Sequence, residues 1–159
     1  MKKLFLPLFL LAAWFVHGRL VFNESRVMPW MTQLSVQTWS GDSKACDAYT
    51  DDVQVSLRAE DRGGHWEVEG GKAELCDYLR KTSAAFVVLG ANTHTEFTDV
   101  AIQRKGFPWT EATLTYTEHV TVQAARLPEI RITSQDELTL VRTLGGVKIK
   151  AVQSSSTQR

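Results

Sequence analysis

The 159-residue sequence has no excess of charge of either sign, because Lys and Arg together number 18 and so do Asp and Glu. Proteins that bind a phosphate backbone usually carry a basic excess or stripe, so we expect no nucleic acid partner. The chain also lacks the GxGxxG and GxxxxGK[ST] patterns of nucleotide-binding loops. It has neither a CxxC nor an HxxxH spacing, which makes a metal site unexpected. We therefore expect no cofactor and no metal ion.

Long apolar runs are also lacking. The run Leu4–Val16 holds thirteen residues, fewer than the ~20 that a membrane-spanning helix needs. Lys2-Lys3 precede this run and His17-Gly18-Arg19 follow it, which is the layout of a signal peptide. The small-residue pattern of a cleavage site is poor, so residues 1–22 have two readings, a cleaved signal peptide or an uncleaved membrane anchor. A buried helix of a cytosolic protein is disfavoured because the segment has no polar face.

The composition beyond this leader is that of an ordinary globular domain, with 43% hydrophobic and 23% charged residues. Helical spacing over residues 23–40 is followed by a short second helical segment, SKACDAYTDD (residues 43–52). The period then changes to two, which predicts a strand at 51–60 and a second strand at 65–70. Gly70-Gly71 ends that strand and begins a short helix over 72–82. The first helix presents one apolar face, formed by Val27, Trp30, Met31 and Leu34.

Four further strands are predicted at 93–104, 112–122, 131–143 and 146–152, with a frayed polar tail at 156–159. Helices followed by a run of antiparallel strands indicate an α+β fold and exclude an alternating parallel one.

The clearest alternation places one acid among apolar residues. Leu114, Tyr116 and Val120 share a face of the 112–122 strand, and Glu118 falls in the same row. Burial would raise the pKa of Glu118 into a range useful for an acid or base, with Tyr116 beside it as a hydrogen-bond donor. The other reading is that Glu118 lies at a rim or a bulge and points outward.

The 93–104 strand offers His94 and Glu96 in one register and Asp99 in the other. The face that lines a cavity stays undecided here, because Phe97 and Val100 disagree about which side is inward. His94 and His119 with Glu96 are conceivable as a zinc set, but without a metal-binding spacing we disfavour it.

From Trp30 to Ser155 the chain resembles the nuclear transport factor 2-like superfamily, which includes ketosteroid isomerase and SnoaL-like proteins. The matching motifs are YTDDVQV (Tyr49–Val55), GGKAELCDYL (Gly70–Leu79) and DELTLVRTLGGVKIKAVQSS (Asp136–Ser155). The resemblance implies a domain over residues 27–155, a cone of about three helices packed on a strongly curved antiparallel sheet. In the first motif, the acidic pair is expected to end the second helix and open the first strand.

The resemblance also bears on activity. The position of the general base of ketosteroid isomerase falls at or beside Leu57, which cannot accept a proton, so that mechanism is disfavoured. We interpret the chain as an exported or membrane-anchored binding or assembly module without catalysis. One alternative is a SnoaL-like isomerase, cyclase or dehydratase, with Glu118 and Tyr116 acting on a small apolar ligand. Its cavity would be lined by Leu57, Trp66, Phe97 and Tyr116. A second alternative is the soluble domain of an envelope or secretion complex, with an envelope protein as its partner.

The resemblance further implies that Cys46 and Cys76 lie on neighbouring helices. In an oxidising compartment we expect them to pair, and the other reading is two buried free thiols. The threonine row opposite Glu118 is either a wet sheet face or a homodimer contact, since sheets of this superfamily commonly pair face to face. The signal-peptide-like leader, together with the expected disulfide, predicts an exported protein. Its location would be periplasmic or anchored at the inner membrane of a bacterial-type cell.

Overall fold

The computed structural model describes residues 5–61, 64–107, 109–124 and 128–158. Its helices are α1 (Phe5–Val21), α2 (Glu24–Ser40), the 3-10 helix η2 (Ser43–Ala48) and α3 (Lys72–Val88). Its strands are β1 (Tyr49–Asp61), β2 (Gly64–Gly70), β3 (Asn92–Lys105), β4 (Glu111–Gln123), β5 (Ile130–Thr143) and β6 (Gly146–Gln158).

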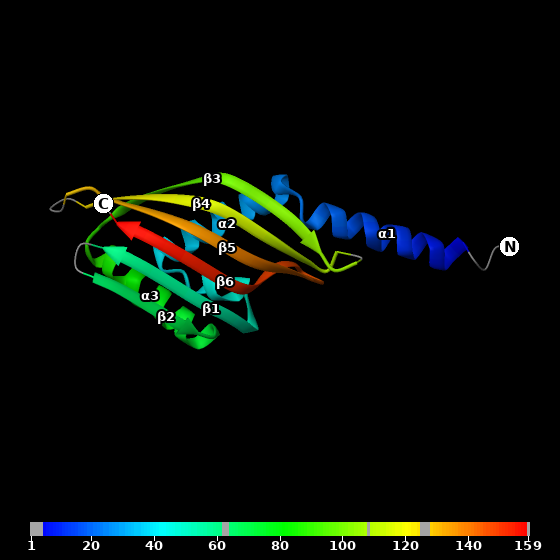
Figure 1. The fold of residues 1–159 in the computed structure, drawn as a ribbon, viewed down its shortest axis with the longest axis horizontal. Coiled ribbons are helices and arrows are strands. Elements are labelled where there is room, and N and C mark those ends of the chain that lie inside the picture. The colour runs from blue at the N-terminus through cyan, green and yellow to red at the C-terminus, as the bar shows by residue number, and fades with distance from the viewer. Residues whose placement is uncertain (1–4, 62–63, 108, 125–127, 159) are drawn as a thin grey trace.

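The six strands form one curved, unclosed sheet in the order β2-β1-β6-β5-β4-β3. All neighbouring strands are antiparallel except β1 and β6, which are parallel. Helices α2 and α3 lie against one face of this sheet, and α1 projects beyond one end of it along the long axis (Figure 1). The predicted α+β cone is confirmed.

Helix α2 forms where the sequence predicts it. The side chain of Asn23 caps its first turn by accepting a hydrogen bond from the Ser25 amide. Gly41 ends the helix with a φ of 76°, a left-handed conformation that glycine adopts without strain. The buried residues Val27, Met31 and Leu34 form the apolar face that packs into the core.

The predicted ends of two helices are wrong. The second helical segment is a 3-10 turn that ends at Ala48, and β1 already begins at Tyr49, so Asp51 and Asp52 lie within the strand. Tyr49 is buried and pairs with Ile149 of β6, and these tertiary contacts draw the segment into the sheet. The third helix continues past Thr82 to Val88, because no proline or glycine interrupts it.

The C-terminal tail also differs from its prediction. Residues 156–158 belong to β6 instead of fraying. Ser156 pairs with Ala59 of β1 on one side and with Ser134 of β5 on the other. Neighbours on both edges satisfy backbone hydrogen bonds that an isolated polar tail would leave to water.

A β-bulge settles which face of β3 is inward. The register of β3 against β4 shifts between Thr98 and Ala101, and Asp99 adopts a positive φ of 54°. The extra residue lets both Phe97 and Val100 pack against the core, although they are three positions apart. The apparent disagreement in the sequence is therefore a real irregularity of the strand.

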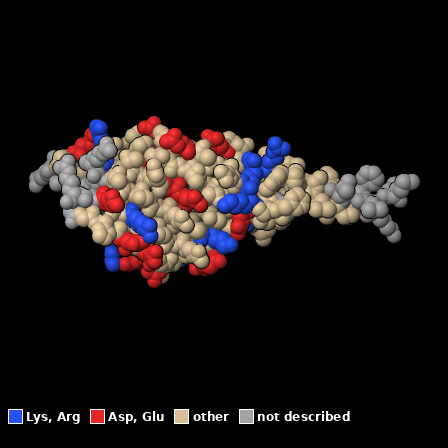
Figure 2. Space-filling view, viewed as in Figure 1, with Lys and Arg blue, Asp and Glu red and all other residues tan. Residues whose placement is uncertain are grey.

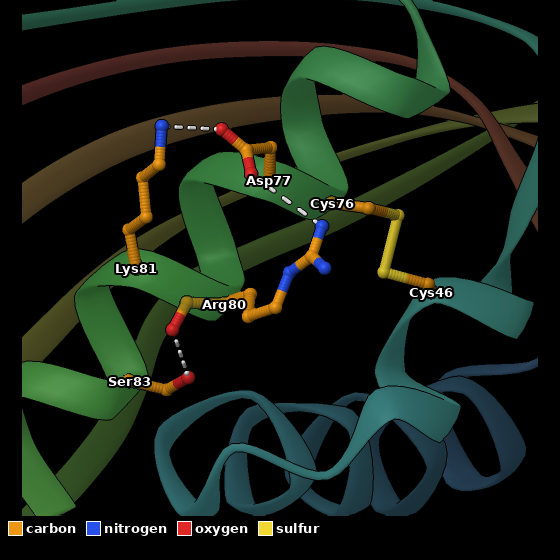
Figure 3. Close-up of polar contacts among 6 residues, drawn as sticks. All are labelled: Cys46, Cys76, Asp77, Arg80, Lys81 and Ser83. Atoms are coloured by element: carbon orange, nitrogen blue, oxygen red, sulfur yellow. Dashed lines mark hydrogen bonds and ion pairs between the residues drawn. A yellow bond between two sulfur atoms is a disulfide. The ribbon is translucent and has the colours of Figure 1, made fainter.

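A disulfide joins the 3-10 turn to α3, as expected. Cys46 and Cys76 are bonded, with their Cα atoms 5.9 Å apart. Asp77, the residue after Cys76, makes ion pairs with Lys81 at 2.6 Å and with Arg80 at 3.4 Å, both one turn further along α3 (Figure 3). The covalent link holds η2, and with it the start of β1, against the helix that covers the cone.

The end of α1 is part of the folded body. Val21 and Phe22 are buried in the core, and the Phe15 ring packs on Trp109 with centroids 4.2 Å apart. The Arg142 guanidinium lies 3.8 Å from the centroid of the Trp14 ring. Within the described ranges, no helix combines the length and apolar character needed to cross a bilayer.

Candidate functional site

A cavity of about 400 Å³ lies between the concave face of the sheet and the helices α2 and α3. The sequence predicts four cavity residues, Leu57, Trp66, Phe97 and Tyr116, and the structure places all four on its wall. They come from β1, β2, β3 and β4 respectively, so the curvature of the sheet brings distant parts of the sequence around one space. Further apolar wall residues are Met31, Leu34, Trp39, Leu75, Tyr78, Leu79, Val120, Ile132 and Leu138.

The cavity has a closed end and an open end. Tyr49, Leu75 and Ile149 line it near the start of β1 and are buried. At the other end of β1 it is lined by Arg58 and Glu60, which are exposed. There the Arg58 guanidinium pairs with Glu67 at 2.7 Å. The mouth therefore opens beside the β1–β2 connection.

Glu118 lies on the cavity wall, partly buried, in the row predicted to face inward. Its cross-strand neighbours are Phe97 on β3 and Ser134 on β5. Burial raises the pKa of Glu118 to about 7, the charge of Asp136 adds to this, and hydrogen bonding with Ser35 of α2 opposes it. A carboxyl group with that pKa exists in both protonation states near neutral pH.

Asp136 is a second cavity carboxyl that the sequence analysis missed. It is buried, lies opposite Tyr116 and Ser154 on the neighbouring strands, and lines the same space. The Ser134 hydroxyl donates to its Oδ2 atom at 2.7 Å. Burial raises the pKa of Asp136, and hydrogen bonds with Ser154 and Ser134 lower it in part. The sequence did contain a signal for this role. Asp136 precedes Leu138 by two residues, and because side chains alternate along β5, both point to the inner face.

Two tyrosines complete the polar part of the wall. Tyr49 and Tyr116 are each only 8% exposed. Burial raises both pKa values, and the charges of Glu118 and Asp136 raise them further, so both hydroxyls stay protonated at neutral pH. The Phe97 ring meets the Tyr116 ring edge-on, with centroids 5.3 Å apart. The wall thus carries two carboxyl groups and two phenol groups among apolar side chains.

The cavity carboxyl groups of Glu118 and Asp136 have no basic side chain close to them on the described wall. Among the described residues that line the cavity, Arg58 is the only basic one, and Glu67 holds it at the mouth. A carboxylate without a nearby cation favours taking up a proton or binding a group that donates hydrogen bonds. The cluster can therefore hold the polar end of a molecule, and Glu118 can give or accept a proton.

The other candidate residues do not join this site. His94 and Glu96 are exposed on β3, and the His119 ring contacts Thr98 and Thr133, 3.3 Å and 3.2 Å from its two nitrogens. In the part of the chain that the structure describes, no three His, Cys, Asp or Glu side chains lie close enough to hold a metal ion. Asp51 forms an exposed ion pair with Lys72.

No family model matches the sequence, and no curated protein matches it. Solved structures do match the fold. The β subunit of benzoate 1,2-dioxygenase from Burkholderia mallei is 10% identical, with a TM-score of 0.67 over 87% of this chain and 91% of that one. ActVI-ORFA from Streptomyces coelicolor is 13% identical, with a TM-score of 0.63 over 82% and 91%.

A third match is a nuclear transport factor 2-like protein with a cystatin-like fold from Novosphingobium aromaticivorans. It is 15% identical, with a TM-score of 0.60 over 88% of this chain and 85% of that one. At such identities the likeness concerns the fold alone. The chain has the nuclear transport factor 2-like fold, which SnoaL-like enzymes and binding modules share.

Proposed function

We propose that the chain binds a small, largely apolar molecule inside the cone, with the polar end of that molecule against Glu118 and Asp136. The observation that carries this proposal is the cavity of about 400 Å³ with apolar walls and one polar cluster. Small-molecule sites typically occupy roughly 300–1,000 Å³ and combine apolar walls with a few convergent polar groups. The cavity meets both criteria.

The walls suit a rigid apolar body. Trp66 and Tyr78 pack with ring centroids 5.4 Å apart near the mouth, and Phe97 and Tyr116 form a second pair farther in. Aromatic side chains offer large apolar contact areas and lose little conformational entropy when a ligand binds. The acceptor-rich cluster favours a hydroxyl or amine at the polar end of the ligand, because such a group can donate to the carboxyl oxygens.

The test is binding of N-phenyl-1-naphthylamine, an apolar aromatic amine whose fluorescence rises in apolar surroundings. Leu57→Trp should fill part of the cavity and weaken binding about tenfold or more, which corresponds to ~1.4 kcal/mol. The matched control is Gln135→Trp, which adds the same side chain at an exposed position on the outer face of β5. Circular dichroism checks that both variants are folded. Absence of saturable binding to the wild type, or equal weakening by both variants, would contradict the proposal.

One observation favours a second function, proton transfer on the bound molecule. The pKa of Glu118 is about 7, which suits a general base or acid at neutral pH. A direct test incubates the protein in D₂O with a panel of cyclic ketones and follows deuterium incorporation next to the carbonyl group by NMR. Exchange that rises as pH passes 7 and is lost in Glu118→Gln would support catalysis. Exchange equal to that of buffer would leave the chain a binding module.

We also propose that the chain works outside the cytosol. The disulfide between Cys46 and Cys76 supports this, because such bonds persist mainly in oxidising compartments. Intact mass of the protein from its native host, alkylated before and after reduction, tests the proposal and shows whether the N-terminal segment is retained. Thiols that react without prior reduction would contradict it.

A further inference from the structure

One end of the molecule exposes apolar residues from three separate segments. On α1, Phe9, Leu10 and Leu11 are 60–71% exposed, and Trp14 and Val16 are about half exposed. Phe107, in the β3–β4 connection, is 83% exposed, and Leu144, in the β5–β6 turn, is fully exposed. Ordinary soluble surfaces carry such residues singly, so their gathering at one end needs an explanation.

Contacts within the fold hold these segments together. The Phe15 ring lies 6.1 Å from that of Phe107 and 4.2 Å from that of Trp109, which ties α1 to the β3–β4 connection. Arg142 stacks on the Trp14 ring and donates to the Trp14 carbonyl at 3.3 Å, which ties α1 to the β5–β6 hairpin. The apolar end is therefore a built surface, and α1 has a defined direction from the body.

Basic side chains surround the base of α1. Arg104 donates to the carbonyl oxygen of Phe22 at 3.2 Å, and Lys105 follows it at the end of β3. Arg19 and Arg142 lie on α1 and β5. Figure 2 shows Lys and Arg atoms gathered where α1 meets the body. Acids stand at this end as well: Glu111 is paired with Lys150 at 3.0 Å, and Glu24 begins α2. Asp51 and Asp52 are exposed near the start of β1, where Asp51 is paired with Lys72.

We propose that this end is a membrane face that rests on an anionic lipid bilayer. In this arrangement α1 inserts its apolar side chains, Phe107 and Leu144 enter the interface, and the basic side chains meet the lipid headgroups. Apolar and aromatic side chains flanked by Lys and Arg are the pattern that interfacial binding requires. The positive charge of the basic side chains around the base of α1 is complementary to anionic lipid, although the chain as a whole is neutral.

The same geometry directs the cavity mouth away from the bilayer. The start of β1 pairs with β6 next to the β5–β6 turn, whereas the mouth residues Arg58 and Glu60 lie at the opposite end of β1. Because β1 has thirteen residues, its two ends lie roughly 40 Å apart. A ligand would therefore enter from the aqueous side and not from the lipid.

The first test uses flotation of the full-length chain with vesicles of phosphatidylcholine and phosphatidylserine, and with vesicles of phosphatidylcholine alone. Phe107→Ser with Leu144→Ser should lower partitioning into the mixed vesicles about tenfold or more. The matched control is Val87→Ser with Val88→Ser, two exposed apolar residues at the opposite end of the molecule. Arg104→Gln with Lys105→Gln should lower it about fivefold per cation, and only when phosphatidylserine is present.

The second test uses native tryptophans to read the orientation. Quenching by brominated lipid should be lost in Trp14→Phe with Trp109→Phe and retained in Trp39→Phe with Trp66→Phe, which removes the rings near the mouth. The opposite pattern would overturn the orientation. Failure of the wild type to float, or equal losses in the Phe107 and Val87 pairs, would overturn the membrane face. Neither result depends on whether the cavity binds a ligand.

Discussion

Replacing Glu118 by Gln should make the fold more stable at alkaline pH and leave its stability almost unchanged at acidic pH. Burial and the charge of Asp136 raise the pKa of Glu118 from 4.5 to about 7. Between pH 4.5 and about pH 7, the Glu118 carboxyl therefore keeps its proton in the folded state, whereas it has released this proton in the unfolded state. Stability is lost as pH rises through this window, and the loss is complete about one pH unit above the folded-state pKa.

The size of this loss in unfolding free energy follows from the size of the shift in the pKa of Glu118. One pKa unit corresponds to about 1.4 kcal/mol, so the wild type should lose about 3 kcal/mol of unfolding free energy between acidic and alkaline pH through this group. Gln has no proton to lose and nearly the same shape. For a domain of this size, the variant should melt roughly 6–12 °C above the wild type at about pH 8. The two should melt together near pH 4.5.

Urea unfolding of both proteins across this pH range, with the disulfide intact, measures the difference directly. Glu137→Gln is the matched control, because Glu137 is exposed on the outer face of β5 and the same charge is removed there. A pH dependence that is identical in wild type and Glu118→Gln would refute the reasoning. It would mean that the Glu118 carboxylate is as well solvated in the cone as in the unfolded chain.

Three further predictions concern the same fold. Asp136→Asn should lower the pKa of Glu118, since the Asp136 charge helps to raise it; NMR titration of the Glu118 carboxyl would show no change if the two groups do not interact. Cys46→Ala with Cys76→Ala should cost about 3–4 kcal/mol, because the bond closes a loop with a sequence separation of 30; urea unfolding that is insensitive to reductant would contradict this. Leu140→Ala, at a position with no solvent exposure, should cost about 2–5 kcal/mol; a loss equal to that of an exposed leucine would place it outside the core.

Local patterns were sufficient for much of the fold. The helical spacing of Val27, Met31 and Leu34 and the cap residues Asn23 and Gly41 predicted α2, because side-chain burial and backbone capping act within a few residues. Alternation in β4 placed Tyr116 and Glu118 in one inward row, because successive side chains of a strand point to opposite faces.

Other features were invisible to local patterns. The bulge at Asp99 and the early start of β1 at Tyr49 depend on pairing with strands far away in sequence. Residues 156–158 look like a disordered tail until β1 and β5 flank them. A one-residue change of register reverses every later side chain, so the inward face of β3 could not be assigned without its partner.

The sequence by itself determined the fold class, the core-facing rows and one acid in the candidate site. Periodicity encodes these features, and periodicity is local. Only the tertiary structure decided that Asp136 and Tyr49 join Glu118 and Tyr116, because the curvature of the sheet brings four positions from three strands around one cavity. It alone also decided that this cavity opens at the end opposite α1, because long-range strand pairing sets which ends of the strands lie together.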